Sequence, residues 1–434
     1  MSTKVWIGLL FLFCVVLGVG RSDLSCAGPS GRHKLQINFW NGFTGPDGQI
    51  MLGIIRKFNE ANPDVEVTMQ RMDWDTYYNK LMVAELDGRG PEVFVIQSQW
   101  MARMNRAGFV ADVSDLFTGS NPIPKDDFDP VVISQVQYGQ KMVGVPLDIW
   151  PFGLYMNADY MKEIGFTDAN GNARAPKDKA EFLKAITELK KTAPDGSADR
   201  WGFALDNWRW DFQSLLPQFN GRYFDEKGRA DLANPNNVAA LQFLVSLNGP
   251  PRLMPPPENA MGWVGFRQKK VAMVVDGIFM VGDLKRLNDF NYVGAPVPVI
   301  GSRPGTLADS HCLCVRHDLS PEMHKAAERF IKFLSNNSID WADAGQVPAR
   351  KSVRADPRFA QMPVQYAFSK EIPYIQYLPR TPVLFDINRE LDFAVESAIR
   401  GRMSSQDALK QASDHVQEEL DRDALEQKEE GLAK

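Results

Sequence analysis

An alternation of strand and helix patterns over residues 35–97 constrains the fold of this chain more than any other feature. Short apolar runs typical of buried strands cover 35–40, 65–70 and 93–97. Amphipathic helix patterns separate these runs at 50–59 and 76–86. This β-α-β-α-β order predicts an α/β protein with a doubly wound, mostly parallel sheet that has crossover helices on both faces.

Polar and aromatic residues follow each of these three strands. Ligands of doubly wound sheets bind at the carboxyl ends of the strands. Here those ends carry Trp40 and Asn41, then Trp74, then Gln97 and Trp100. Each end therefore combines a tryptophan with a polar neighbour, and we expect Trp40, Asn41, Gln97 and Trp100 to contact a ligand.

A second α/β region has helix patterns at 179–191 and 237–247 and strand patterns at 202–205 and 271–275. The strand at 202–205 is followed by Trp208 and Trp210, which we place in a polar loop. The strand at 271–275 ends at Asp276. We expect all three side chains to face a ligand, although a lone tryptophan is more often a packing residue and an Asp before Gly277 can simply shape a turn.

The stretch 146–163, which reads PLDIWPFGLYMNADYMKE, places an acid and aromatic rings beside an apolar strand. Asp148 offers carboxylate acceptors and Trp150 a flat apolar face, while Asn157 can cap the helix that follows. Hydroxyl groups bound at the edge and C–H faces stacked on rings are what a sugar requires. The stretch therefore favours a sugar site, with a purely structural role for Asp148 as the alternative.

The same stretch resembles the signature of family 1 extracellular solute-binding proteins, the carbohydrate receptors of bacterial ABC importers. Four further segments resemble motifs of that family, in the family's order, at 58–63 (FNEANP), 265–277, 326–349 and 401–409. Together they span nearly the whole chain after its leader. One departure is Met156, where the family usually has tyrosine.

The resemblance implies a two-lobed periplasmic-binding-protein fold, each lobe a doubly wound sheet flanked by helices, with the ligand in a cleft between the lobes. The ranges that we expect are 35–145 plus 298–347 for the N-lobe and 146–297 plus 348–434 for the C-lobe. Hinge strands are then expected near Val145, Val297 and Pro348. Closure of the hinge would capture the sugar.

The implied partners are a carbohydrate and the transmembrane permease subunits of an ABC importer, with the protein itself a monomer. No Gly-x-x-x-x-Gly-Lys loop for ATP is present, and we expect no cofactor and no enzymatic activity. Arg380 completes the predicted site, where it would meet either an anionic ligand or a structural carboxylate. The expected ligand contacts are thus Trp40, Asn41, Gln97, Trp100, Asp148, Trp150, Trp208, Trp210, Asp276 and Arg380.

The first 26 residues predict export. Lys4 precedes an apolar run at 5–19 that is too short to span a membrane, which is typical of a secretory signal peptide. Cys26 stands where bacterial lipoproteins carry their lipid, so we expect a periplasmic or cell-surface protein that meets the membrane only through this anchor. The alternative is ordinary cleavage near Gly20.

Composition narrows the class further. The chain has 434 residues, 44% of them hydrophobic, which suffices for two or more domains with buried cores. Its formal net charge of -5 argues against nucleic acid as a partner, because no basic stripe is available to neutralise phosphates.

His311, Cys312, Cys314 and His317 lie close together in the sequence and suggest a metal site. On a strand, however, the two cysteines share one face while His311 points to the other. We therefore expect buried structural thiols and no metal.

Three other functions suit parts of the sequence. The loop 42–48, just before a helix, offers backbone N–H groups to a sugar phosphate or a glycerol phosphodiester. Two of Asp148, Asp211 and Asp276 could form the carboxylate pair of a glycoside hydrolase. The third is an adhesin or structural lipoprotein with the same fold, which would bind no small molecule.

Overall fold

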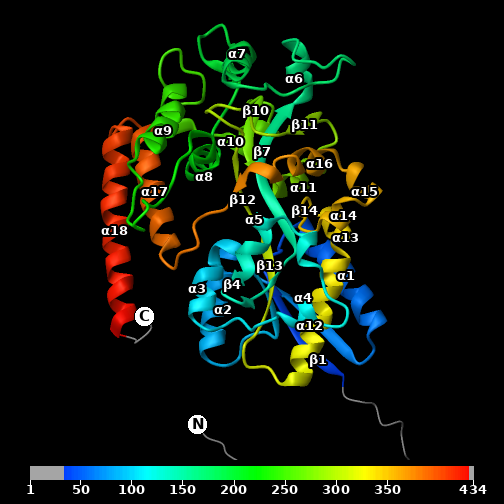
Figure 1. Ribbon diagram of the computed structural model, residues 1–434. Coiled ribbons are helices and arrows are strands. Elements are labelled where there is room, and N and C mark those ends of the chain that lie inside the picture. The colour runs from blue at the N-terminus through cyan, green and yellow to red at the C-terminus, as the bar shows by residue number, and fades with distance from the viewer. Residues whose placement is uncertain (1–33, 430–434) are drawn as a thin grey trace, which may run out of the picture.

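The computed structural model describes residues 34–429 and has two α/β lobes joined by crossing strands (Figure 1). The predicted signal peptide and Cys26 lie outside the described residues. In Figure 1 the lower lobe carries the blue and cyan elements with the yellow helix α12 (Pro321–Asn336), and the upper lobe carries most of the green and orange ones. Within residues 34–429, no helix combines the length and the apolar character that crossing a membrane requires.

The sheet of the first lobe has the strand order β2-β1-β3-β13-β6. Its strands are β1 (Leu35–Asn41), β2 (Val65–Arg71), β3 (Val93–Gln97), β13 (His311–Val315) and β6 (Val145–Pro146). β1 pairs in parallel with both β2 and β3, whereas β13 runs antiparallel to β3 and to β6. The alternation predicted for residues 35–97 is confirmed.

Two crossover helices cover this sheet for reasons that are visible in the sequence. Helix α1 (Pro46–Ala61) starts with proline at its first position and buries Met51, Ile54, Ile55 and Phe58, which share one helical face. Helix α2 (Trp74–Leu86) is capped by Asp73, whose side chain accepts a hydrogen bond of 3.0 Å from the backbone N–H of Asp75.

The sheet of the second lobe is built around one long strand, β7 (Asp148–Asn157), whose ten residues are all buried. Its neighbours are β10 (Met273–Gly277), β11 (Tyr292–Ala295), β12 (Thr306–Asp309) and β14 (Val347–Pro348). All four pair antiparallel with β7, and β15 (Ile375–Gln376) pairs in parallel with β12.

The mostly parallel arrangement predicted for this second sheet is therefore wrong. β7 is long enough to pair with different strands along its length, and the connections between these strands are long enough for the chain to return in either direction. An apolar run identifies a buried strand but carries no information about its direction. Parallel pairing in the described part of this lobe includes the short β12–β15 pair and isolated bridges such as those between Trp201 and Val271 and between Ala204 and Val274.

Two chain segments pass directly from one sheet to the other, and Leu147 in the first of them is hydrogen-bonded to the second and to Ala349, which follows β14. The chain leaves β6 and enters β7 through Leu147, whose N–H donates to the His311 carbonyl over 2.8 Å and whose carbonyl accepts from Ala349 N–H over 3.3 Å. A second passage runs through Ser310, between β12 and β13. It lies beyond the crossing expected near Val297, because β12 still pairs with β7 and β15.

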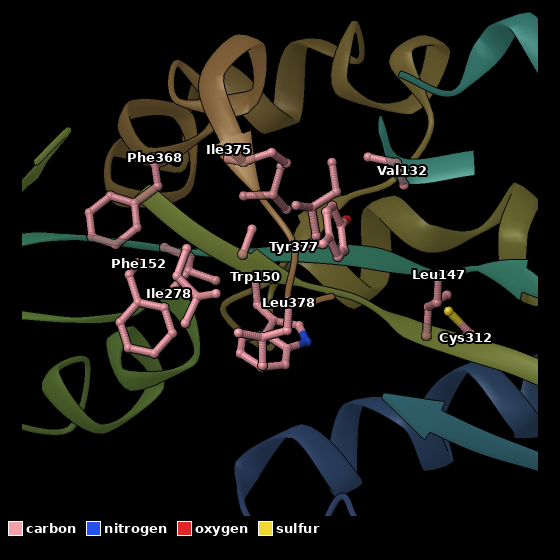
Figure 2. Packing of buried hydrophobic residues seen from close by; sticks show 14 of the residues in the cluster. Val132, Leu147, Trp150, Phe152, Ile278, Cys312, Phe368, Ile375, Tyr377 and Leu378 are labelled. Carbon is pink, nitrogen blue, oxygen red and sulfur yellow. The ribbon is translucent and has the colours of Figure 1, made fainter. Parts of the chain in front are cut away.

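A continuous hydrophobic cluster passes through this junction (Figure 2). Leu147 and Cys312 lie beside each other at one side of the view, and Phe152 and Phe368 at the other. Trp150 and Leu378 lie between these two pairs, near the centre of the view. The residues that join the lobes thus belong to the same buried hydrophobic cluster as the interior of the lobes.

Helices α17 (Leu384–Ile399) and α18 (Ser405–Glu429) pack side by side along one flank of the molecule (Figure 1). α18 also reaches the first lobe, where its Asp423 forms an ion pair with Arg106 of α3 (Met101–Arg106). The last helix therefore contacts both lobes.

Candidate functional site

A cavity of ≈ 440 Å³ lies between the two lobes, within the size range of small-molecule sites. From the first lobe it is lined by Asp47, Trp74, Gln97 and His311. From the second lobe and the segments beside it, it is lined by Trp150, Trp210, Phe279, Asp283, Arg286 and Gln346. Both lobes contribute polar and aromatic groups to the same space.

Aromatic rings form both walls of the cavity. On the second lobe, Trp150 lies 5.8 Å from Phe279 and 6.5 Å from Trp210, measured between ring centroids. On the first lobe, Trp74 stacks on the His311 ring with a centroid distance of 5.6 Å and an interplanar angle of 13°. These rings offer flat apolar faces from opposite sides.

Asp148 lies beneath the cavity and has no exposed surface. One carboxylate oxygen accepts from the backbone N–H of His311 over 2.9 Å. The other bonds to Nδ1 of the same ring over 2.8 Å and accepts from the indole Nε1 of Trp341 over 2.7 Å. Asp148 thus holds His311 in place instead of lining the cavity itself.

The environment of His311 favours its charged form. Burial on its own lowers the pKa of the ring, but attraction and hydrogen bonding from Asp148, together with the charges of Asp309 and Asp47, raise that pKa above its ordinary value. Asp309 lies on β12 and bonds to the Ser98 hydroxyl, and burial raises its pKa to about 6. Within residues 34–429, the hydrogen bond of the His311 ring is the one between Nδ1 and Asp148, so Nε2 is left for a ligand.

Two buried polar atoms of cavity residues also have no partner among the residues that the structure describes. They are the indole Nε1 of Trp150, whose side chain is almost fully buried, and the amide Oε1 of Gln346. Buried polar groups are nearly always hydrogen-bonded, so such atoms mark places where a ligand or water can bind. One is a donor and the other an acceptor, which suits hydroxyl groups.

Charged residues at the cavity have both signs. Burial raises the pKa of Asp47, whose carboxylate also accepts from the Gly48 N–H over 2.8 Å. Asp283 accepts from the Trp263 indole over 2.9 Å and pairs with Arg267 at 3.2 Å. Arg286 adds a guanidinium group to the lining.

Of the ten predicted contacts, Gln97, Trp150 and Trp210 line the cavity. Gln97 uses its Oε1 to accept from the Tyr78 hydroxyl at 3.4 Å and from Gln99 Nε2 at 3.2 Å, which leaves its own amide N–H groups for the cavity. That these three residues touch a ligand stays a prediction.

The segment expected to be a loop after 202–205 is instead helix α8 (Trp208–Leu215), capped by the side chain of Asn207. Successive helical residues are rotated by about 100°, so Trp208 and Trp210 point to different sides. Trp210 lines the cavity, whereas Trp208 lines a separate small pocket and lies 5.2 Å from the guanidinium of Arg400. The expectation that both tryptophans stand in a polar loop is therefore wrong.

The other predicted contacts from the first lobe, Trp40, Asn41 and Trp100, pack against or bond to other parts of the protein and do not line the cavity. Trp40 is partly buried against the core. Asn41 is buried, and its Oδ1 accepts from the Phe43 N–H over 3.1 Å. Trp100 packs between Tyr78 and Phe385, with centroid distances of 3.9 and 3.8 Å.

Asp276 and Arg380 also lie away from the cavity lining. Asp276 is buried at the end of β10, where it accepts from the Gly277 N–H over 2.7 Å, and burial raises its pKa well above the ordinary value. Arg380 donates to the carbonyls of Ser134 and Gln137, each over 2.7 Å, and lies 4.0 Å from the Tyr138 ring centroid. The Arg380 guanidinium therefore bonds to the protein backbone and, among the residues that the structure describes, to no carboxylate.

Sequence reasoning did not select Asp47, His311, Asp283, Arg286 or Gln346. His311 was considered only as a metal ligand. Cys312 and Cys314 are buried free thiols on β13, and within residues 34–429 no group of three or more His, Cys, Asp and Glu side chains is arranged for a metal ion. Trp74 lines the cavity but is not among the ten expected contacts. Its position after the carboxyl end of the second strand was the feature of the sequence that indicated it.

Two α/β lobes, joined by crossing strands and enclosing an aromatic and polar cavity, define a two-lobed ligand-binding protein. The profile of the family described as bacterial extracellular solute-binding protein matches residues 53–365, and the chain belongs to that family. The family resemblance inferred from the sequence motifs is confirmed.

The comparisons with individual proteins agree. An arabinooligosaccharide-binding protein of Bacillus subtilis (strain 168) is 23% identical over 457 residues, covering 98% of this chain and 99% of its own. A maltotriose-binding protein of Pyrococcus abyssi (strain GE5 / Orsay) is 21% identical over 357 residues, covering 80% and 74%. The solved structure of the sugar-binding protein MalE from Xanthomonas citri has a TM-score of 0.78 at 19% identity and covers 90% of this chain and 98% of that one. The predicted two-lobed fold is thereby confirmed.

Proposed function

We propose that this protein captures an oligosaccharide outside the cytoplasm and delivers it to an ABC importer. The observation that carries the proposal is the cavity between the lobes, where Trp74 on one side and Trp150, Trp210 and Phe279 on the other present ring faces. Such faces stack on the apolar sides of sugar rings, and the carboxylates and amides between them suit the hydroxyl groups. The names of the two curated relatives, a maltotriose- and an arabinooligosaccharide-binding protein, support the same class of ligand.

Binding is coupled to closure of the lobes. A ligand that contacts Trp74 on one lobe and Trp210 on the other stabilises whichever arrangement brings both walls against it. The importer's permease subunits would recognise this closed form, and the energy for transport would come from the importer.

A neutral sugar fits the site better than a sugar phosphate or glycerol phosphodiester. The loop before α1 does reach the cavity, but Asp47, in the first turn of α1, lines the cavity at the same place. A carboxylate at that point repels a phosphate group and accepts hydrogen bonds from hydroxyl groups.

Hydrolysis of a glycosidic bond is the less favoured function. The three carboxylates that the sequence offered, Asp148, Asp211 and Asp276, are all buried and none lines the cavity. The curated relatives are binding proteins, which supports a binding role.

The test is thermal unfolding of the purified protein with maltotriose, arabinotriose, glucose and glucose 6-phosphate. A ligand present at one hundred times its dissociation constant stabilises the folded state by about 2.7 kcal/mol. We expect a clear rise in melting temperature with at least one of the neutral sugars. A rise with glucose 6-phosphate alone, or with none of the four compounds, would contradict the proposal.

We also propose that residues 1–26 direct export and that Cys26 carries a lipid, so that a monomeric receptor is tethered at the cell surface. The sequence pattern of these residues is the support. Metabolic labelling with a palmitate analogue tests this. A wild-type protein that takes up no label would rule out the anchor.

A further inference from the structure

We propose that His311, positioned by Asp148, and the indole N–H of Trp150 together donate hydrogen bonds to the bound sugar, and that sugar affinity therefore depends on pH. The inference deepens the proposed function and rests on it. It concerns two residues of the cavity and one residue beneath it.

The orientation of the His311 ring is fixed on several sides. Its Nδ1 bonds to Asp148 over 2.8 Å, and the same carboxylate oxygen is held by Trp341 over 2.7 Å. Trp74 stacks over the ring at 5.6 Å, and Phe43 meets it edge-on at 5.1 Å. A ring held in this way cannot exchange its two nitrogens, so Nε2 is the atom that remains for a ligand.

The Trp150 indole lies beside this ring, with 6.1 Å between the ring centroids. Its Nε1 is buried and has no partner within residues 34–429, although an indole N–H can only donate. The acceptor that it requires must therefore enter the cavity. Oxygen atoms of a sugar are such acceptors, and Gln346 Oε1, also without a partner, can accept in return from a hydroxyl.

The charge on His311 decides what Nε2 can do. In the neutral ring Nδ1–H donates to Asp148 and Nε2 can only accept, whereas in the cation Nε2 donates as well. The charged groups that face the ring are Asp148 from β7, Asp309 from β12 and Asp47 from α1, and all three favour the cation. Asp283 and Arg286 line the same cavity with opposite charges.

The direction of the pH dependence follows. The pKa of His311 is raised above its ordinary value, so the ring keeps its proton to a higher pH than an unperturbed imidazole and loses it as the pH rises through this raised pKa. Donation from a charged group is stronger than from a neutral one, and we expect affinity to fall roughly tenfold once the proton is lost. The pH range in which a change of affinity can be assigned to His311 begins at about pH 6.5, because the pKa of the neighbouring Asp309 is raised to about 6.

The experiment is calorimetric titration of maltotriose and of arabinotriose into the full-length protein between pH 6.5 and 9. Three variants are compared with the wild type. His311→Gln removes the titrating group, Trp150→Phe removes the N–H and keeps a ring, and Asp148→Asn removes the charge that orients the histidine. The matched controls are His415→Gln, a half-buried histidine of α18 that bonds to Glu390 of α17 away from the cavity, and Trp208→Phe in the separate pocket.

We expect Trp150→Phe to bind roughly tenfold more weakly at every pH, and His311→Gln to bind more weakly at pH 6.5 and to show a flat pH profile. Asp148→Asn should shift the profile to lower pH. If Asp148→Asn does not fold, the other two variants still decide. Affinities and a pH profile equal to the wild type in both would overturn the inference while leaving sugar binding intact.

A loss of affinity in His311→Gln with an unchanged pH slope would assign the histidine a structural role and would also overturn the inference. If neither trisaccharide, nor any other neutral sugar of the thermal panel, binds the wild type, the proposed function itself fails. The two failures are therefore distinguishable.

Discussion

At the scale of single residues, the contacts of buried carboxyl groups depend on partners that are distant in the sequence. Asp148 was expected at a ligand, yet its hydrogen bonds go to His311 and Trp341. No local pattern around Asp148 predicts partners that lie more than 150 positions further along the chain. The sequence identified an acid near the site correctly, and only the fold assigns it to the layer beneath.

Glu371 gives a prediction at this scale. It is fully buried, its Oε1 accepts from the Val297 N–H over 2.7 Å, and its Oε2 has no partner within residues 34–429. Burial raises its pKa well above the ordinary value, so the stability that it contributes is complete below the unfolded-state pKa and is lost as the pH rises. Glu371→Gln keeps the shape without the charge and should stabilise the protein at pH 8 by about 1–3 kcal/mol.

Urea unfolding at pH 5 and pH 8 measures this effect. The control is Glu226→Gln, at an exposed position, which should change nothing at either pH. Equal stability of Glu371→Gln and the wild type at pH 8 would contradict the prediction.

At the scale of helices and strands, hydrophobic patterns predicted which elements exist, and whether each is a helix or a strand. They predicted the direction of the strands and the residues at which elements begin and end less well. The alternation over residues 35–97 gave three strands and two helices at the expected positions. The direction of the strands around β7 was not predictable, because antiparallel and parallel neighbours of a buried strand have the same apolar composition. The run 202–205 forms only isolated bridges, and the segment after it, expected to be a polar loop, forms helix α8 from Trp208.

The helical geometry of α8 separates the roles of its two tryptophans. Trp210→Ala removes a ring from the cavity wall and should weaken sugar binding by about 1–3 kcal/mol. Trp208→Ala should leave sugar affinity unchanged and lower the melting temperature, because that ring packs beside Arg400 in a different pocket. Titration calorimetry together with thermal unfolding of both variants checks the prediction, and equal losses of affinity would refute it.

At the scale of the whole molecule, the two lobes are linked both at the junction and along one flank. The junction consists of the passages through Leu147 and Ser310, and the flank is covered by α18, whose Asp423 pairs with Arg106 of the first lobe. The sequence predicted two lobes and a hinge by resemblance to a family. The contact of α18 with the first lobe lay outside that reasoning, because ion pairs between distant elements leave no local pattern.

Sugar binding should make the whole molecule more compact. Contact with Trp74 on one side and Trp210 on the other draws the walls of the cavity together. Small-angle X-ray scattering with and without saturating maltotriose or arabinotriose should show a smaller radius of gyration with whichever sugar binds. Trp210→Ala at the same sugar concentration serves as the comparison and should stay closer to the unliganded value. A wild-type radius that does not change on binding would argue against closure.

The hydrogen bonds at Leu147 have a consequence for how such a motion can run. Each passage between the sheets is short, and the carbonyl and N–H of Leu147 connect its own passage to His311 and to Ala349. Segments tied at one point can turn about a common axis but cannot slide past one another. We therefore expect the lobes to turn about this junction, and neither Leu147 nor Ser310, which lie in it, belongs to the cavity lining. Substitutions that change which sugar is bound can accumulate on the walls while the mechanics of the receptor stay the same.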